Sequence, residues 1–198
     1  MMQLLTKTPD QRIVHHGRTW EQFKHIQSGF EGSSVVRLFY YNGTIEILMP
    51  GENYEFFKTI IGFLIELFLA EQGIEFIPAG SMTQERQGVA SAQADESYWV
   101  GEKRAVPDLS IEVVLTSGDE SKLERYRALG VPEVWFWEDG LFTLYHLRDN
   151  GYERIYRSEL PTLADLDIEL LTQCVLIAQT SRVEAFREFK RAIGSGED

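Results

Sequence analysis

An acid-bearing strand is the feature of this sequence that first suggests chemistry. The stretch "DLSIEVVL", residues 108–115, has the apolar content of a buried strand, yet it contains two carboxylic acids. Side chains alternate between the two faces of a strand. One face therefore consists of Leu109, Ile111, Val113 and Leu115, and the other of Asp108, Ser110, Glu112 and Val114. Buried acids are rare without a partner, so the second face is a candidate site, and Lys122 on the next element is a candidate partner.

A third acid, Asp95, lies in the preceding strand-like run "ADESYWV". If the two runs pair as antiparallel strands, Asp95 and Glu112 lie side by side on one face. Neighbouring carboxylates repel each other, which raises one pKa unless a cation lies between them. A hard ion such as Mg²⁺ or Mn²⁺ takes oxygen ligands and keeps waters for a substrate and a nucleophile. With a lysine nearby to orient a water or stabilise charge on a phosphate, we expect half of a metal-dependent phosphodiesterase site here.

Each of these assignments has a simpler alternative. Glu112 could be an acid on a solvent-facing side of the sheet. Glu96 would face the ion instead of its neighbour if the register were shifted by one residue. Lys122 could be a surface lysine of its helix, paired with Glu120 or Glu124.

Asp108 shares a face with Glu112 but lies four residues before it. Four residues of strand span about 13 Å, which is too far for both acids to bind one ion directly. We expect Asp108 either to support the metal ligands from behind or to mark the start of the strand, where Pro107 fixes the approach of the chain.

The first half of the chain should form the elements that lead up to these strands. "TWEQFKHIQSGF" reads as a short helix, with Thr19 and Gln22 spaced as a capping box. Two strand-like runs surround Asn42-Gly43, which is the strongest short signal for a hairpin. From about Asn53, apolar residues recur at helical spacing until Gly73, a fitting helix end.

The second half alternates between further strands and two helices. "IEFIPAGSMTQER" reads as a strand that the polar loop "QGVASAQ" joins to "ADESYWV". "DESKLERYRALG" is a helix with Asp119 or Ser121 near its cap. Three strands should follow, "VPEVWFWED", "LFTLYHLRD" and "YERIYRS", with turns at Asp139-Gly140 and Asn150-Gly151. The tail "TSRVEAFREFKRAIG" has the pattern of an amphipathic helix.

This order of elements predicts a mixed α/β sheet flanked by helices. A strand–helix–strand crossover places its two strands parallel, whereas the loops between the central strands are too short for a crossover and imply antiparallel pairing. No linker or repeat divides the chain, so we expect one domain. Within it, residues 1–50 should form a helix and hairpin extension packed on a core of residues 51–198.

Composition limits the classes of protein that remain. The chain has 198 residues, one cysteine and a net charge of −12. No apolar run reaches the roughly 20 residues of a membrane span, and a lone cysteine excludes an internal disulfide, so we expect a cytoplasmic protein without a membrane partner. An acidic domain binds nucleic acid poorly unless its basic groups gather on one face or a metal supplies positive charge.

The series "ADESYWV", "PDLSIEVV" and "KLERYRALGVPEVWFW" resembles the Uma-two family, a group of restriction-endonuclease-like proteins with a PD-(D/E)xK site. The resemblance runs from about Thr19 to Leu171 and includes "ILMPGENYEFFKTIIGFLIELF". It implies a restriction-endonuclease-like fold. The short motif alone is common by chance, but the whole ordered series is far more specific.

By position, the resemblance assigns the acid of the first half of the motif to Asp95, with Ala94 where the family has proline. Glu112 matches the acid of the second half. The family's usual lysine would be residue 114, which is Val114, and the resemblance suggests that Lys122 on the following helix reaches the same space.

Glu55, near the start of the long helix, matches an acidic position that could complete the metal shell, although Phe56 follows it where the family often has histidine. Alternatively, Glu55 is a first-turn acid favoured by the helix dipole.

The resemblance thus implies a Mg²⁺- or Mn²⁺-dependent endonuclease acting on DNA. Glu112 and Asp95 would hold the metal, Glu55 would assist, and Lys122 would position the attacking water. Two alternatives stay open: a nuclease-derived fold that binds without cleaving, and a metal-dependent phosphodiesterase acting on RNA or a small nucleotide. A homodimer is the default expectation, because related nucleases often cut two strands as dimers.

Overall fold

The computed structural model describes residues 11–33, 35–114 and 121–194. The strands are β1 (Gln11–His15), β2 (Arg37–Tyr41), β3 (Thr44–Met49), β4 (Phe76–Pro78), β5 (Thr83–Arg86), β6 (Ala90–Gln93), β7 (Glu96–Val100), β8 (Leu109–Val114), β9 (Glu133–Glu138), β10 (Leu141–Arg148) and β11 (Gly151–Ile155). The helices are α1 (Trp20–Gly29), α2 (Glu52–Glu71), α3 (Ser121–Leu129), α4 (Ile168–Ala178) and α5 (Arg182–Gly194). The N-terminal sheet has the order β1-β3-β2-β6-β5, and the central sheet has the order β11-β10-β9-β8-β7-β4.

The N-terminal sheet is built on the β2–β3 hairpin. Asn42 and Gly43 both have positive φ, 45° and 71°, as a two-residue Asn-Gly turn requires, so the predicted hairpin is confirmed. Helix α1 begins after Thr19, and the reciprocal bonds of Thr19 and Gln22 form the predicted capping box. The helix covers one face of the hairpin with an apolar cluster made of Phe23, Leu38, Tyr40 and Ile45.

The central sheet is mixed, as the order of elements predicted. β7 and β8 pair antiparallel, whereas β8 and β9 pair parallel and have α3 between them in the chain. β9, β10 and β11 then continue as antiparallel neighbours. The turns fall where predicted, with positive φ at Asp139, Gly140 and Gly151. The fold is thus an α/β architecture with one crossover inside an otherwise antiparallel sheet.

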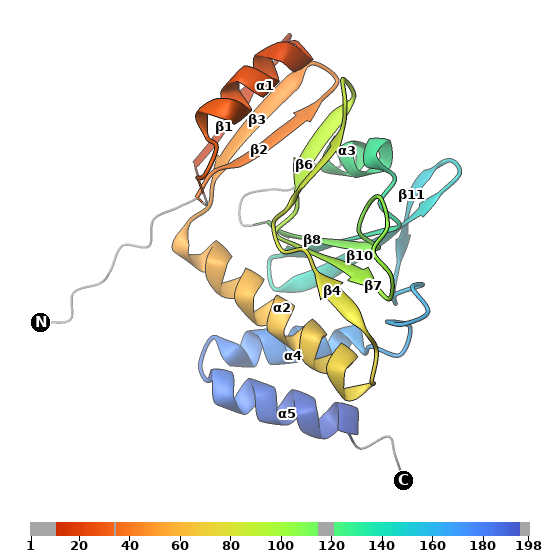
Figure 1. Ribbon diagram of the computed structural model, residues 1–198. Helices are drawn as coiled ribbons and strands as arrows, with labels where there is room; N and C mark the ends of the chain where they lie inside the picture. The colour runs from red at the N-terminus through yellow and green to blue at the C-terminus, as the bar shows by residue number, and fades with distance from the viewer. Residues whose placement is uncertain (1–10, 34, 115–120, 195–198) are drawn as a thin grey trace, which may run out of the picture.

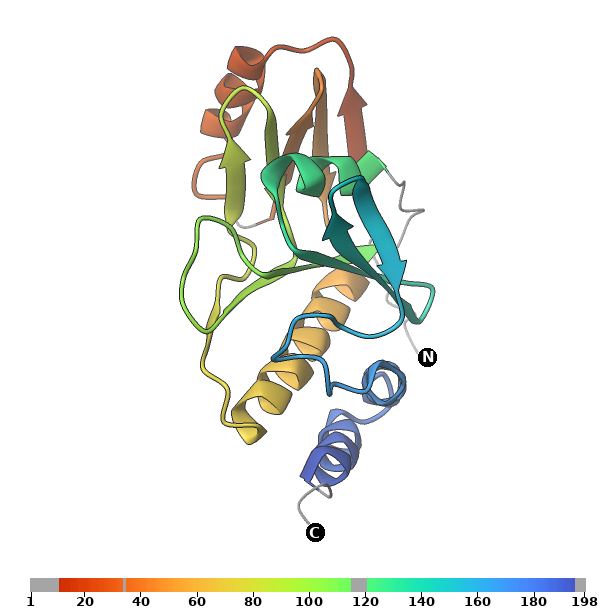
Figure 2. The same cartoon turned by 90° about the vertical axis from the view of Figure 1, so that its right-hand side faces the viewer.

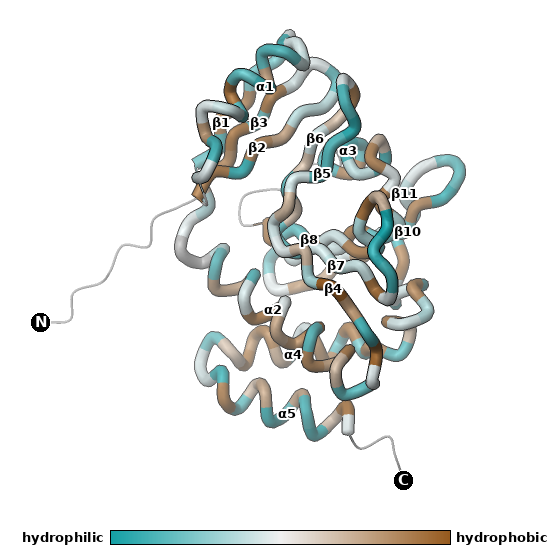
Figure 3. Tube along the Cα trace, in the orientation of Figure 1, coloured by the Kyte–Doolittle hydropathy of each residue, from teal (hydrophilic) through white to brown (hydrophobic). Residues whose placement is uncertain are grey.

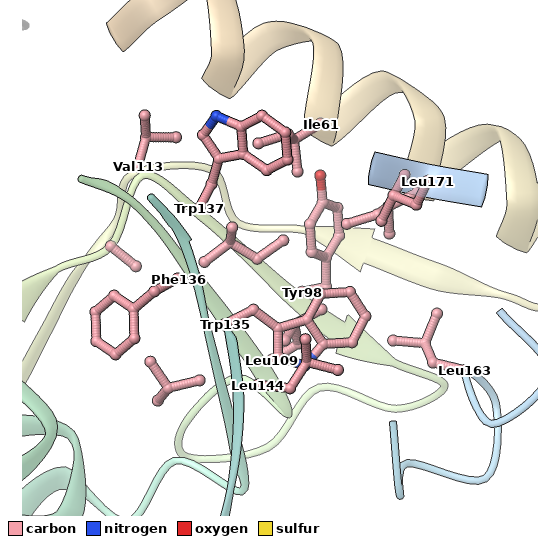
Figure 4. Packing of buried hydrophobic residues seen from close by; sticks show 14 of the residues in the cluster. Ile61, Tyr98, Leu109, Val113, Trp135, Phe136, Trp137, Leu144, Leu163 and Leu171 are labelled. Carbon is pink, nitrogen blue, oxygen red and sulfur yellow. The ribbon is translucent and has the colours of Figure 1, made fainter. Parts of the chain in front are cut away.

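The central sheet separates two sides of the molecule (Figures 1 and 2). Helices α2, α4 and α5 lie on one side, here called the α2 side, and α3 with the N-terminal sheet lies on the other, the α3 side. Val113, Trp137 and Ile61 lie together at α2, and Phe136 lies on the other side of its strand (Figure 4). Because Phe136 is the register partner of Glu112 and neighbours in register share a face, Glu112 belongs to the α3 side.

The helices on the α2 side differ in how apolar they are. The hydrophobic colours dominate along α2 and α4, whereas α5 alternates with hydrophilic positions (Figure 3). The long helix expected from about Asn53 is α2, and Gly73, with φ of 66°, follows it. The expected tail helix is α5. None of the helices in the described ranges is both long and apolar enough to cross a membrane.

Two local expectations were wrong, and two elements were not predicted. The run "IEFIPAGSMTQER" contains β4 and β5, which belong to different sheets, and Gly80 between them has φ of 53°, where a strand cannot continue. The expected loop "QGVASAQ" contains β6. Neither β1 nor α4 was predicted. β1 is a short, mostly exposed edge strand, whereas α4 buries Leu171, Cys174, Val175 and Ala178 at a helical spacing that was overlooked.

Strand pairing also crosses the division at residue 50. β2 lies before that position and pairs with β6, which lies after it. The helix and hairpin therefore share a sheet with part of residues 51–198. Of the two cap residues expected for α3, Asp119 lies outside the described residues, and the helix begins at Ser121.

Candidate functional site

The antiparallel pairing of β7 and β8 brings Asp95 beside Glu112. Glu96 is the register partner of Ile111, and the Asp95 N–H donates to the Ile111 carbonyl at 2.9 Å. The Val113 N–H in turn donates to Asp95 Oδ2 at 2.6 Å, which holds the carboxylate against β8. Asp95 and Glu112 are each 1% exposed. The side-by-side arrangement that the sequence predicted for these acids is present, and it lies deep in the molecule, so Glu112 is not a solvent-facing acid.

Helix α3 places two further side chains on Glu112. Lys122 and Tyr126 are four residues apart and therefore lie on the same face of the helix. The Lys122 Nζ lies 3.6 Å from Glu112 Oε2, and the Tyr126 hydroxyl donates to Glu112 Oε1. Lys122 is only 7% exposed, and Glu124 pairs with Arg127 instead. The lysine on the following helix thus reaches the space that the resemblance implied for it.

Burial and repulsion change the protonation of this cluster. Burial raises the pKa of Asp95 well above its usual range, and the Glu112 carboxylate raises it further, against the opposing effects of the Val113 N–H, Lys122 and Arg37. Asp95 therefore keeps its proton to a higher pH than an ordinary aspartate does. Burial, followed by the negative charge of Glu112, also raises the pKa of Tyr126, whose hydroxyl stays a hydrogen-bond donor.

Asp95 Oδ1 has the properties of an unused metal ligand. It is buried and has no hydrogen-bond partner within the described ranges of the chain, whereas buried polar atoms are nearly always bonded. A hard divalent cation would take this oxygen and remove the repulsion between the two acids. Mg²⁺ is often held by one or two carboxylates, with waters and phosphate oxygens completing its shell. The donor set of Asp95 and Glu112 therefore fits Mg²⁺ or Mn²⁺.

The structure does not bring Glu55 into this pair. Glu55 lies near the start of α2 with its side chain 52% exposed, 3.8 Å from Arg37 Nη2 and 3.6 Å from Lys58 Nζ. Among the residues that the structure describes, no three His, Cys, Asp or Glu side chains gather to hold a metal. Arg37 links the two regions, because its charge also acts on Asp95. Glu55 lies next to the candidate site and outside its ligand pair.

Asp108 holds the start of β8. Its Oδ2 accepts from the Val100 N–H at 3.0 Å, and its Oδ1 accepts from Arg104 Nη1 at 2.6 Å. Both oxygens are thus engaged across the connection between β7 and β8. Of the two roles expected for Asp108, the geometry favours the start of the strand.

Glu96 points away from the candidate site, to the α2 side. A Cβ added at Gly62 of α2 would lie 3.5 Å from the Glu96 carboxyl carbon, and Lys58 Nζ lies 4.0 Å from Glu96 Oε1. Burial raises the pKa of Glu96 to about 7, Lys58 opposes the shift, and Glu66 adds to it. The register therefore directs Asp95, and not Glu96, toward Glu112.

Glu46 on β3 is a buried acid that sequence reasoning did not single out. Its oxygens lie 2.8 Å from Arg12 Nε and 3.1 Å from Arg125 Nη1. Burial alone would raise the pKa of Glu46, but Arg125, Arg12 and Lys122 together keep it below its usual value. Arg125 also lies over the Phe39 ring, 4.3 Å from its centre. These contacts tie α3 to the N-terminal sheet and so fix the helix that carries Lys122; the only hint in the sequence is an acid inside the apolar run "TIEILM".

Comparisons with known proteins agree with this arrangement. A family model described as "Putative restriction endonuclease", the Uma2 family, matches residues 20–174. The match includes both strands of the acid pair and helix α3, and the mixed α/β architecture is consistent with a restriction-endonuclease-like fold. A search of curated proteins found no significant match. The family match spans more than half of the sequence, and the chain therefore belongs to the Uma2 family.

Proposed function

We propose that this protein is a metal-dependent endonuclease that hydrolyses phosphodiester bonds of DNA. The observation that carries the proposal is the convergence of Asp95, Glu112 and Lys122, from two strands and a helix, on one buried point. The description of the family supplies DNA as the class of substrate. The oxygen ligands and the amine supply a chemistry that suits phosphate ester hydrolysis.

Asp95 and Glu112 would hold the ion through the unused Asp95 Oδ1 and a carboxylate oxygen of Glu112. When bound, Mg²⁺ or Mn²⁺ supplies positive charge for the phosphate and lowers the pKa of a water in its shell. The Tyr126 hydroxyl holds Glu112 Oε1 and the Val113 N–H holds Asp95 Oδ2, so both carboxylates are oriented by rigid elements.

Lys122 would position the attacking water and stabilise the negative charge that develops on the phosphate. Its Nζ is 3.6 Å from Glu112 Oε2, longer than a hydrogen bond. The amine can therefore turn toward a water or a phosphate oxygen without breaking a tight contact. Because Glu46 and Arg125 fix α3 against the N-terminal sheet, the amine stays within reach of Glu112.

The net charge of −12 opposes nucleic-acid binding, and local positive charge at the site would offset it. Arg37 and Lys122 are both buried and the charge of each acts on Asp95, so basic groups lie where a phosphate would bind. We further propose a cytoplasmic location, since the single cysteine, Cys174, is buried and free. We also propose a homodimer, which would bring two such sites to one nucleic acid.

The proposal is tested by plasmid nicking with Mg²⁺ or Mn²⁺ and with EDTA. We expect Glu112→Gln to lower the nicking rate about 100-fold or more, because a metal ligand supplies several kcal/mol of transition-state stabilisation. Lys122→Met should lower the rate about 100-fold, as removal of one charge-stabilising donor does. The matched controls are Glu124→Gln and Lys190→Met, which remove an exposed acid on α3 and an exposed lysine on α5.

Equal nicking by the wild type and Glu112→Gln would mean a contaminating nuclease and would overturn the proposal. Titration calorimetry with Mn²⁺ alone gives a second readout, in which uptake should depend on Glu112 and not on Glu124. The same reactions with single-stranded DNA and with RNA separate a DNA endonuclease from an RNA or nucleotide phosphodiesterase.

A further inference from the structure

A groove of about 500 Å³ lies on the face of the N-terminal sheet that is turned toward α3. It is lined by Arg12, Val14, His16, Tyr41, Asn42, Thr44, Glu46 and Arg125. Strand pairing explains this set, because Val14 is the partner of Glu46, and Tyr41 is the partner of Thr44, so these side chains share one face. Helix α1 covers the opposite face with the apolar cluster described above. The groove is therefore a polar feature of a sheet whose other side is closed.

Charged side chains connect the groove with the candidate site. Glu46, on its floor, is held by Arg12 at 2.8 Å and by Arg125 at 3.1 Å. Lys122 lies near enough to Glu46 for its charge to lower the pKa of that acid, and it also lies 3.6 Å from Glu112. A ligand in the groove would thus be adjacent to the helix that carries Lys122.

The lining has the chemistry of a site for a nucleic-acid strand. Among the described residues of its lining, Arg12 and Arg125 share one acid, Glu46, so basic groups outnumber acidic ones there. His16, whose Nδ1 lies 3.1 Å from Thr44 Oγ1, adds a polar ring. Tyr41 adds an aromatic surface on which a base can stack. The groove near Arg37 and Lys58 is also cationic, but it has no aromatic side chain in its lining.

We propose that this groove binds one strand of nucleic acid, with phosphates on Arg12 and Arg125 and a base on Tyr41. This inference rests on the proposed function, because only that function makes the neighbouring acid pair a cleavage site for the bound strand. Pockets of about 300–1,000 Å³ hold small molecules, so a groove of about 500 Å³ has room for nucleotide-sized groups. A base can stack on Tyr41 only where it is unpaired, so the preferred substrate is a single-stranded segment or an unpaired end.

The test measures binding of a short fluorescein-labelled oligothymidylate by anisotropy, with EDTA present so that no cleavage occurs. We expect Arg12→Gln to weaken binding about fivefold and to reduce the salt slope by about one. Tyr41→Leu, which keeps apolar bulk, should weaken binding about fivefold with the salt slope unchanged. Arg191→Gln is the control, because it removes an ion-paired arginine on α5, at the far end of the molecule from β1.

Circular dichroism melting separates lost binding from lost folding, and the inference requires that Arg12→Gln stay folded with weakened binding. Equal binding by the wild type and Arg12→Gln, or tighter binding of a duplex than of the single strand, would overturn it. Failure of the two proposals is distinguishable. Nicking that depends on Glu112, without an effect of Arg12 on binding, rejects the groove alone. Binding that depends on Arg12, without any nicking, supports the groove and rejects the nuclease.

Discussion

Two buried glutamates on neighbouring parallel strands, Glu112 on β8 and Glu133 on β9, show how differently the same side chain can be used. Both are at most 1% exposed. Glu133 Oε1 accepts hydrogen bonds from His146 Nδ1 and from the N–H groups of Glu159 and Leu160. Its Oε2 accepts from Trp135 Nε1 and Ser158 Oγ. Glu112 has the Tyr126 hydroxyl on one oxygen, the Lys122 amine on the other, and a second acid beside it.

The difference teaches that burial of an acid does not by itself indicate a site. Glu133 is surrounded by donors that satisfy both of its oxygens, so it ties β9 to the segment around Ser158 and has no capacity left for a ligand. The pair of Asp95 and Glu112 is under-satisfied, with one oxygen unused in the described structure and a lysine at a distance that allows movement. Spare coordination capacity is what marks the candidate metal centre.

The same Glu→Gln substitution should have opposite effects at the two positions. It should lower mainly the stability at Glu133 and mainly the nicking rate at Glu112. In Glu133→Gln one oxygen becomes an NH₂ group, so at least two of the buried donors lose their acceptor whichever way the amide is turned. We expect the free energy of unfolding in urea to fall by about 2–4 kcal/mol. Glu112→Gln should change it by about 1 kcal/mol or less, because without the Glu112 charge the neighbouring Asp95 can ionise and its negative charge then compensates Lys122.

If the two substitutions lower the free energy of unfolding by similar amounts, Glu112 contributes to folding as much as Glu133 does, and the contrast between the two acids is wrong. Nicking gives the converse readout. At a temperature where both variants are folded, Glu133→Gln should retain the wild-type rate, since within the described residues the hydrogen bonds of Glu133 involve neither Asp95, Glu112 nor Lys122.

Glu96 sharpens the comparison, because it is buried and has a raised pKa without lying in the candidate site. Its pKa is about 7 in the folded protein against a usual value of 4.5, so the folded state keeps the proton to higher pH than the unfolded state. Stability from this group is therefore lost as pH rises from about 4.5 to about 7, by about 3 kcal/mol. Urea unfolding across that range should show the wild type falling relative to Glu96→Gln.

The control for this pH dependence of stability is Glu153→Gln, which removes an exposed acid paired with Arg148. If the free energy of unfolding depends on pH in the same way for the wild type and Glu96→Gln, Lys58 fully offsets the effect of burial on the pKa of Glu96. Asp95 on the α3 side would then have a raised pKa without a counterpart at Glu96 on the α2 side.

Sequence reasoning reached Asp95 and Glu112 because the information is local. Strand alternation defines the face of Glu112, and the short connection between the two runs forces an antiparallel pair. Lys122 was singled out from its place on the next element and assigned to the site by the family resemblance, but its distance to Glu112 could not be predicted, because that distance depends on how α3 packs. Glu133 could not be assigned, because its partners lie as far as 27 residues along the chain. Glu46 was missed for the same reason: Arg125 is 79 residues away.

The fold shows the same division between local and distant information. The hairpin at Asn42 and the crossover through α3 follow from turn chemistry and connection length. The separation of β4 from β5 and the pairing of β2 with β6 depend on which sheet each short strand joins, and no local pattern encodes that choice. Helix α4 did carry a local signal that was missed, because Leu171, Cys174, Val175 and Ala178 are buried at helical spacing, while Gln173 and Leu176 are exposed.

The smallest effect is expected at Glu55, where the resemblance and the geometry disagree about a metal role. Its side chain is half-exposed and lies between Arg37 and Lys58 at 3.8 and 3.6 Å. Pairs of this kind are screened by water and contribute about 0.5 kcal/mol or less. We expect Glu55→Gln to change unfolding in urea by no more than that amount and to change the nicking rate by about twofold at most.

Calorimetry with Mn²⁺ decides the point independently of stability. If the ion is held by Asp95 and Glu112 alone, Glu55→Gln should bind it as tightly as the wild type does, while Glu112→Gln should not bind it. Loss of binding in both variants would place Glu55 in the metal shell. Because the acid would then have to leave Arg37 and Lys58, loading the metal would have to move the first turns of α2 toward β8. The distinction between a satisfied acid and an under-satisfied pair would then extend to a third carboxylate that is recruited only when the ion binds.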